Sequence, residues 1–488
     1  MRKSVYFRPF FVAISAIWLF MMVLLIQRTA QTRRESLEQT PSYAEHDSTE
    51  WMSIYLSGNK IGYIMSITRE TETGYQGTES SYMRFGLSGT DQDMKTFVRA
   101  RSDKNYALQS FSFEIRSKHQ LLKANGNVVG NALQVKLNSE GEIQDLRFTL
   151  PDDAYMPFSI APLIKEKGLK EGDSLSITVF DPAAFQPTNM WIKHLGSQRI
   201  NHRGETRHAT HLSVSFFGTR MDMWVDENGR TLRQEGPMGL LIVEEPREMA
   251  EKFPHTERPV ELLTLFSIPT EEKIANPRSV AYLKVELDGV ELDPEKISNN
   301  RQKILDTSPV QIEIRAVQPG STPGADIPVD LEKYLASEPL LQADHPRVKA
   351  VSDSIVKGKT DPWERSQAIA DWVRSSLKKS PTVSLPSAVD VLTTRRGDCN
   401  EHAVLLAALL RAAGIPATIA TGVVYLEGSF YYHAWNRVYV GRWIDMDATF
   451  GQHVADATHL LLAEGGIENQ ASIANVIGRL TIRIRDYR

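Results

Sequence analysis

Three residues whose side chains could carry out covalent catalysis follow one another near the end of the chain: Cys399, His433 and Asp447. A cysteine thiolate attacks a carbonyl carbon, an imidazole exchanges protons near neutral pH, and a carboxylate holds the imidazole in one orientation. These residue types predict a catalytic triad with Cys399 as the nucleophile, His433 as the base and Asp447 as the partner of the base.

The neighbours of the cysteine predict that it stands at the start of a helix. Gly397 and Asp398 come just before Cys399, and the almost entirely apolar run 404–413 follows and stops at Gly414. This pattern is typical of a buried helix. The unpaired backbone N–H groups and the dipole at its start would favour a thiolate. The alternative is that Cys399 is simply a small buried apolar residue, as lone cysteines often are.

Two strands are expected to bring the histidine and the aspartate together. Residues 431–440 and 443–450 are predicted to form two strands on either side of a tight turn at Gly441 and Arg442. Such a hairpin would place His433 opposite or nearly opposite Asp447. The sequence therefore predicts that the base and its carboxylate lie side by side.

Other residues compete for these roles. His402 lies one turn along the same predicted helix as the cysteine, where it is expected to point along the core. His453 and His459 have no predicted partner strand. Asp445 lies on the same strand face as Asp447, which fits the expected separation better.

No metal or cofactor is expected. His202, His208 and His211 lie in a segment that alternates like a strand, without a nearby carboxylate triad, which favours surface histidines over a metal site. Residues 226–229 lack the alternating ligands and terminal glutamate of a calcium loop and predict a hairpin turn. Cys399 is the single cysteine, so cysteine-rich zinc and iron–sulfur sites are excluded.

Composition excludes two classes of protein, and the N-terminus suggests a location. Hydrophobic residues make up 41% and charged residues 24%, which excludes wholesale disorder. The 56 basic and 60 acidic residues argue against a dedicated nucleic-acid binder.

Residues 10–26 are apolar except for Ser15 and are flanked by arginines, which predicts a transmembrane anchor. A cleaved signal peptide is the alternative.

Strand-like and linker-like stretches divide the rest of the chain. Short alternating runs separated by turn residues predict antiparallel β structure before the Pro- and Gly-rich stretch that follows residue 318. The expected parts are an anchor over 1–35, a linker over 36–50, a β-rich region over 51–318 with a break near 250, a second linker over 319–330, a catalytic domain over 331–470 and a terminal strand over 471–488.

Three motifs resemble the core of the transglutaminase-like superfamily. They are Gly-Asp-Cys-Asn-Glu-His-Ala around Cys399, His-Ala-Trp at His433 and Asp-Ala-Thr at Asp447, within about 331–450. The resemblance implies a papain-like α+β fold and a Cys399–His433–Asp447 triad. It also implies an acyl-enzyme formed from a protein or peptide amide and resolved by water or an amine. The third motif departs from the more usual Asp-Pro-Thr in a turn residue and keeps the carboxylate.

Taken together, these patterns predict an α+β protein with an N-terminal transmembrane helix, an antiparallel β-rich domain and a C-terminal papain-like domain. The predicted function is that of a cysteine peptidase, amidase or transamidase anchored in the inner membrane, with most of the chain on the periplasmic side. The alternative is a non-catalytic scaffold of the same fold. In either case the β-rich region could hold a protein partner.

Overall fold

The computed structural model describes residues 48–488 except for 88, 119, 140, 151, 183–185, 217–218, 254–258, 290–291, 321–329, 381–386, 466–472 and 474–475. The described residues form two compact units. The first contains Asp91–Val260 and the described strands that come before Gly86. The second contains Glu261–Arg488. Each unit is described by itself below.

The first unit is built on one sheet of fifteen strands, whose spatial order is β8 to β1 followed by β15 to β9. Neighbouring strands are antiparallel except for β9 and β10, which run parallel. Buried and less buried residues alternate along strands such as β4 and β7, as in a sheet with one face in a core. The strands are β1 (Ser48–Leu56), β2 (Asn59–Thr71), β3 (Gly74–Leu87), β4 (Thr90–Asp103), β5 (Leu108–Ser117), β6 (Leu121–Val129), β7 (Ala132–Ser139), β8 (Glu142–Thr149), β9 (Ala154–Tyr155), β10 (Ser174–Asp181), β11 (Gln186–His202), β12 (Glu205–Phe216), β13 (Thr219–Val225), β14 (Thr231–Gly236) and β15 (Leu240–Glu244).

Short helices accompany this sheet. They are α2 (Ile160–Lys167), η1 (Pro237–Gly239) and α3 (Arg247–Ala250). The predicted turn at 226–229 joins β13 to β14, where the Asp226 carboxylate accepts the backbone N–H groups of Asn228 and Arg230, each at 2.8 Å. That local bonding explains why the turn could be recognised from its residues alone.

The second unit carries two further sheets. One has the order β16-β23-β22-β25, with β24 also paired to β23, and the other has the order β18-β19-β17-β26. A third, two-stranded pair joins β20 to β21 in parallel. The strands are β16 (Ile268–Pro269), β17 (Tyr282–Asp288), β18 (Gln302–Thr307), β19 (Val310–Arg315), β20 (Lys378–Lys379), β21 (Arg396–Gly397), β22 (Ala417–Leu426), β23 (Ser429–Tyr439), β24 (Trp443–Met446), β25 (Leu460–Glu464) and β26 (Thr481–Tyr487).

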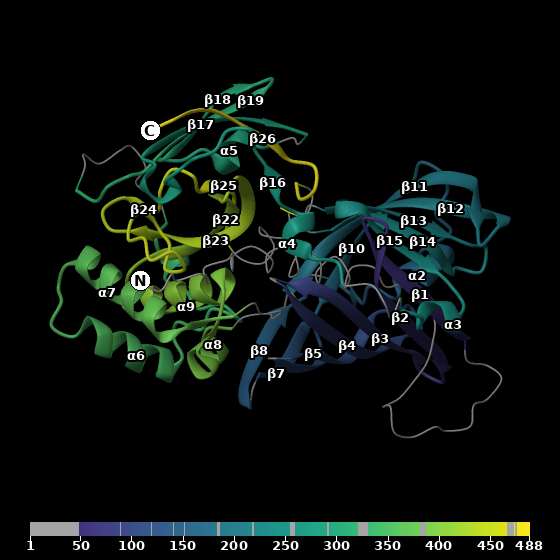
Figure 1. Ribbon diagram of the computed structural model, residues 1–488. Coiled ribbons are helices and arrows are strands. Elements are labelled where there is room, and N and C mark those ends of the chain that lie inside the picture. Colours follow the sequence, from purple (N-terminus) through teal and green to yellow (C-terminus); the bar gives the residue numbers. More distant parts are fainter. Residues whose placement is uncertain are drawn as a thin grey trace. The chain divides into compact units, whose positions relative to one another are not determined.

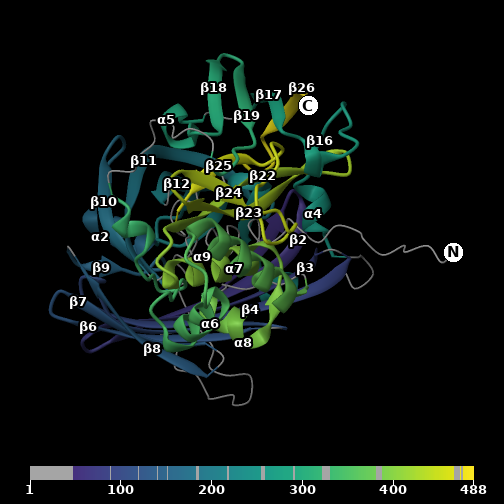
Figure 2. The same ribbon diagram turned by 90° about the vertical axis from the view of Figure 1, so that its left-hand side faces the viewer.

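Four helices of the second unit cover one side of the sheet that contains β22 and β23, and the sheet of β17–β19 and β26 lies on the other side (Figures 1 and 2). The four helices are α6 to α9. Helix α9 (Cys399–Ala412) is central, because it packs against the other three helices and against strands β22 and β23. Its side chains are buried from Cys399 to Arg411. The helices of this unit are α4 (Leu262–Leu265), η2 (Pro277–Ser279), α5 (Pro294–Ile297), η3 (Glu332–Tyr334), α6 (Pro346–Val356), α7 (Pro362–Ser376), α8 (Ala388–Thr394) and α9 (Cys399–Ala412).

Local capping explains where the four covering helices begin. His345, Asp361 and Ser387 precede α6, α7 and α8, and each side chain accepts a backbone N–H of the first turn. Such caps satisfy donors that have no partner inside the helix. Asp398 plays the same part for α9. The start of α9, and with it the position of the cysteine, is therefore fixed by the residue just before it.

The expected α+β class with an N-terminal transmembrane helix is wrong. The structure is strand-rich, with 52% of it in strands and 19% in helices. Many strands of the first unit are eight to seventeen residues long, so the sheets outweigh the helices. No helix in the described part is long and apolar enough to cross a bilayer, and residues 10–26 lie outside that part. The inner-membrane, periplasmic location that depended on this helix is therefore not supported.

A glycine in the second unit offers a test of the packing. Gly422 of β22 lies opposite His433 on β23 and Leu461 on β25, and a Cβ atom there would lie 2.0 Å from the backbone oxygen of Leu460. We expect Gly422→Ala to lower the free energy of unfolding by about 2–3 kcal/mol, measured by urea unfolding. Gly428→Ala is the control. A Cβ atom at Gly428 would meet no other atom within 4 Å, and we expect the substitution to cost about 1 kcal/mol only because φ there is +95°. Equal losses at both positions would contradict this packing.

Candidate active site

The cysteine is the first residue of α9, and the turn before it is built to start a helix. The Asp398 side chain accepts the backbone N–H of Asn400, and the Glu401 side chain accepts the backbone N–H of Asp398 at 2.9 Å. Gly397 makes room for this, because a Cβ atom there would lie 2.2 Å from the Cβ atom of Glu401. Cys399 is fully buried. Its predicted place at the helix start is confirmed.

Strand β23, which carries the second predicted residue, packs against the helix that begins with the cysteine. The backbone N–H of Ala434, the residue after His433, acts on the Cys399 thiol and lowers its pKa. Among the described residues, the pairings on this edge of β23 stop at Phe430 with β16 and resume at Asn436 with β24. The start of α9 therefore meets β23 at a gap in the ladder, where a backbone donor can turn toward a side chain.

The ionisation of the thiol differs from the sequence-based expectation. The helix start was expected to favour a thiolate, but burial raises the pKa of Cys399 well above its usual value. The neighbouring Asp398 carboxyl adds to this, while the hydrogen bond from Ala434 acts the other way. Burial and repulsion from Glu401 also raise the pKa of Asp398 well above its usual value. Since Cys399 is fully buried, the cost of burying a negative charge outweighs the favourable position at the helix start.

His433 and Asp447 form a buried pair. The Nε2 atom of His433 lies 2.8 Å from Oδ2 of Asp447, and both side chains are excluded from solvent. The other carboxylate oxygen accepts the backbone N–H groups of Thr449 at 2.7 Å and Phe450 at 3.2 Å. Because an ionised carboxylate only accepts, His433 must donate from Nε2. A neutral His433 then carries on Nδ1 the lone pair that can take a proton.

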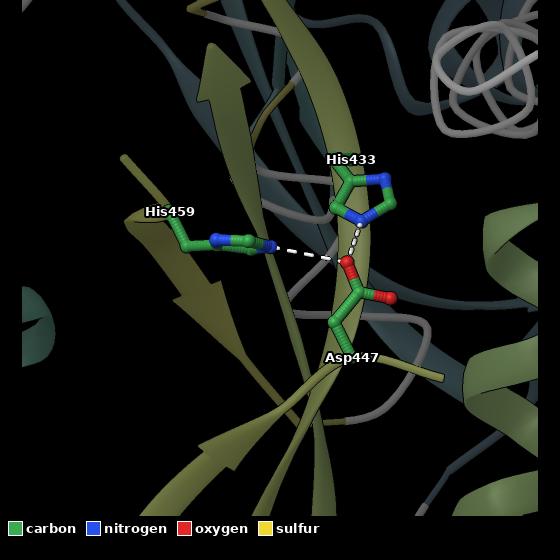
Figure 3. Close-up of side chains that lie close together, drawn as sticks. All are labelled: His433, Asp447 and His459. Carbon is green, nitrogen blue, oxygen red and sulfur yellow. Dashed lines mark hydrogen bonds and ion pairs between the residues drawn. The ribbon is translucent and has the colours of Figure 1, made fainter. Parts of the chain in front are cut away.

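A second histidine reaches the same carboxylate. The Nε2 atom of His459 lies 3.1 Å from Oδ2 of Asp447, and Figure 3 shows the two imidazoles approaching that oxygen from different sides. Burial alone would raise the pKa of Asp447, but attraction to His433 and hydrogen bonds from both histidines hold it well below its usual range. Asp447 is therefore the most heavily bonded of the three predicted residues.

His459 has no partner strand that the sequence predicts, and it was not among the three expected site residues. In the structure it directly precedes β25, which pairs with β22 beside His433. The ladder between β22 and β25 shifts register at Gly422, so this neighbourhood could not be read from strand alternation. The one local signal was the aspartate three residues earlier, Asp456, whose carboxylate lies 3.6 Å from Nδ1 of His459.

The competing residues are used elsewhere. Asp445 pairs with Arg301 at 3.1 Å and accepts the indole N–H of Trp435 at 2.7 Å. Because this bond uses the single N–H of the indole, Trp435 cannot also donate to an oxyanion that forms during attack by Cys399. His402 bonds the backbone oxygen of Asp398 through Nδ1 at 2.5 Å, and burial lowers its pKa to about 4. His453 binds Asp371 on α7 at 2.8 Å.

One group within the described part of the chain could hold a metal ion. Ligand atoms of His433, Asp447 and His459 lie within 4.8 Å of one another. Both Nε2 atoms already point at the carboxylate as hydrogen-bond donors, so neither has a lone pair there for an ion. The geometry therefore favours a hydrogen-bonded group. Of the histidines considered earlier, His202 and His211 bind two different carboxylates, Glu244 at 2.7 Å and Asp222 at 2.9 Å.

Comparison with known proteins agrees with the motifs. Residues 349–448 match the family model described as the transglutaminase-like superfamily. Over 154 residues the chain is 30% identical to the kyphoscoliosis peptidase of Mus musculus, covering 27% of this chain and 22% of that protein. It is 28% identical over 138 residues to an uncharacterized protein of Haemophilus influenzae, covering 27% of this chain and 37% of that protein. The chain spans about a fifth to two fifths of the length of the curated relatives that it matches.

Two solved structures show more distant likeness. One is a Cytophaga hutchinsonii protein named as a proposed cysteine protease, 20% identical, with a TM-score of 0.29 over 43% of this chain and 86% of that chain. The other is a beta-barrel-like protein of Brucella abortus, 12% identical, with a TM-score of 0.33 over 40% of this chain and 94% of that chain.

Proposed function

Residues 349–448 belong to the transglutaminase-like superfamily, and from this premise we propose that the chain is a cysteine-dependent acyl transferase or amide hydrolase. Cys399 is the nucleophile, His433 the general base and acid, and Asp447 the partner of His433. The substrate is an amide of a protein or peptide. The observation that carries the proposal is the buried His433–Asp447 pair; the residue after His433, Ala434, acts on the Cys399 thiol through its backbone N–H.

The reaction starts from an uncharged thiol, in keeping with the raised pKa of Cys399. The thiol proton moves to Nδ1 of His433 as the sulfur attacks the amide carbonyl carbon, and Asp447 stabilises the imidazolium that forms. The carbon–nitrogen bond then breaks, and the leaving amine takes the proton from His433. A thioester remains on Cys399.

The second half of the reaction reverses these roles. Water or an amine gives a proton to His433 and attacks the thioester carbon. The carbon–sulfur bond breaks, and His433 returns the proton to the sulfur. Water yields a carboxylic acid, and an amine yields a new amide. During both attacks the backbone N–H of Cys399, which has no intrahelical acceptor at this first position, can donate to the developing oxyanion.

Trapping the thioester tests this proposal. We expect the full chain, mixed with denatured protein or peptides and quenched in acid, to carry an acyl adduct on Cys399 by intact-protein mass spectrometry. The adduct should be absent from Cys399→Ser and at least about 100-fold slower to form in His433→Gln, because general base catalysis contributes about that much. Adduct formation that does not depend on His433, or equal peptide turnover by the wild type and Cys399→Ser, would contradict the proposal.

One observation favours the alternative function, a non-catalytic binding module. The Cys399 side chain has no exposed surface, so a substrate carbonyl must enter by a local movement of the protein. The same experiment separates the two functions. A scaffold would bind a partner without an adduct, and its affinity for that partner would be unchanged in Cys399→Ser.

A further inference from the structure

We propose that His459 is a protonated positioning residue that bonds the same oxygen of Asp447 as His433 does, from a different direction, and limits the pull of Asp447 on the base. The inference rests on the proposed function, because it assigns a role in setting the proton affinity of His433. The structural observations for it are the contacts of the His459 ring, and none of the three family motifs contains this residue. His459 lies outside residues 349–448, which the family model covers.

Both ring nitrogens of His459 face acceptors. Nε2 lies 3.1 Å from Oδ2 of Asp447, while Nδ1 lies 3.2 Å from the backbone oxygen of Asp456 and 3.6 Å from its carboxylate. A neutral imidazole has one N–H and one lone pair, so one of these faces would set a lone pair against an oxygen. Only the imidazolium donates on both sides. The ring is also fully buried, which makes a mismatched nitrogen costly.

Charged groups on the surrounding segments fit this state. Asp447 and Asp456 are the two carboxylates at the ring, and together they hold the pKa of His459 above its usual value although burial opposes the charge. Arg278 pairs with Asp456 at 3.0 Å. Arg301 donates to the backbone oxygens of Asp456 and His459. Other titratable groups that interact with Asp447 are Arg278, Lys379 of β20, Cys399 and His402 of α9, and the base His433 itself.

A clamp of this kind has a defined consequence for catalysis. Asp447 shares one oxygen between two histidines whose ring centres are 5.7 Å apart. If His459 holds a positive charge, it offsets part of the negative charge that His433 would otherwise meet. His433 then gives its proton up more readily to the leaving amine. If His459 carried no charge, the base would hold its proton to higher pH.

The protonation state can be measured without any substrate. We expect ¹⁵N-histidine NMR of the full chain to show one imidazole protonated on both nitrogens from pH 6 to at least pH 8. That signal should disappear in His459→Gln. In Asp456→Asn, which removes one of its two carboxylates, it should titrate at lower pH. A neutral His459 ring at pH 7 in the wild type would overturn the inference, whether or not the variants fold.

The effect on the base is read from the pH profile of thioester formation. His459→Gln keeps a donor toward Asp447 but has no charge, and we expect it to move the acid limb of the profile, where His433 must lose its proton to act as the base, up by about one pH unit. His453→Gln is the matched control, because His453 also binds an aspartate but on α7, and its profile should match the wild type. An unmoved limb in a folded His459→Gln would overturn the assigned role. If instead no thioester forms in the wild type while His459 is doubly protonated, the proposed function fails and the assignment of His459 stands.

Discussion

Asp447→Asn is expected to reduce turnover of an amide substrate roughly 10³–10⁴-fold while leaving the chain folded. Asp447 accepts from Nε2 of His433, and that acceptance sets the tautomer with the lone pair on Nδ1. An asparagine amide can rotate its N–H₂ group toward His433, and the ring must then offer its lone pair at Nε2. The base would carry its proton on the wrong nitrogen, and the thiol of Cys399 would have nowhere to send its own.

The acid side of the stability curve provides a second readout for the same variant. The folded-state pKa of Asp447 is held well below its unfolded value. Its contribution to stability is therefore complete above the unfolded pKa, near 4, and is lost as the pH falls through the folded pKa. Asp447→Asn should flatten that part of the curve, as followed by urea unfolding between pH 2 and pH 6.

Asp371→Asn is the matched control for both measurements. Asp371 also binds a histidine nitrogen, at 2.8 Å, but its side chain is largely exposed and its partner is His453. We expect turnover within about twofold of the wild type and little change in acid stability, as for other exposed pairs. If Asp447→Asn retained more than a tenth of wild-type turnover, the proposed role of the carboxylate would be wrong.

The parts of the site that lie close together in sequence could be predicted from it. Asp398 caps a helix whose apolar run is unmistakable, so Cys399 could be placed at its first residue. The β23–β24 hairpin turns at Gly441, and its register, with Asn436 opposite Met446, leaves Asp447 within reach of His433. Both features depend on the backbone preferences of residues close together in the chain, and for this reason the sequence alone predicts them.

The parts that depend on long-range pairing could not be predicted. His459 reaches Asp447 only because β25 pairs with β22 across a register shift, and no local residue pattern encodes that pairing. Strand β26 pairs with β17, which comes far earlier in the chain, so the C-terminal strand belongs to a sheet that no linker-based division reveals. The ionisation of Cys399 differs from the expectation for a related reason, since the burial that raises its pKa is created by elements distant in sequence. The domain bounds inferred from linkers remain predictions.

Burial also makes the charged side chains next to the site important for stability. Arg301 contacts several of the segments that carry them. Its guanidinium is 3.1 Å from Asp445 and donates to the backbone oxygens of Asp456 at 2.7 Å and His459 at 3.3 Å. About 3% of its side chain is exposed. One side chain therefore ties the end of β24 to the segment that carries His459. Arg437 also approaches Asp445, at 3.4 Å.

Arg301→Met is expected to lower the free energy of unfolding by about 3–5 kcal/mol, because it keeps the apolar stem but leaves a buried carboxylate and two backbone oxygens short of a donor. Urea unfolding followed by tryptophan fluorescence measures the loss. Arg315→Met is the matched control: its pair with Glu313 is 2.7 Å long, but the arginine side chain is 56% exposed, so we expect a loss of at most about 1 kcal/mol. Since Arg301 also fixes the backbone of His459, the acid limb of the pH profile should shift in Arg301→Met and stay in place in Arg315→Met. Equal stability losses in the two variants would show that the buried contacts of Arg301 are worth no more than a surface pair.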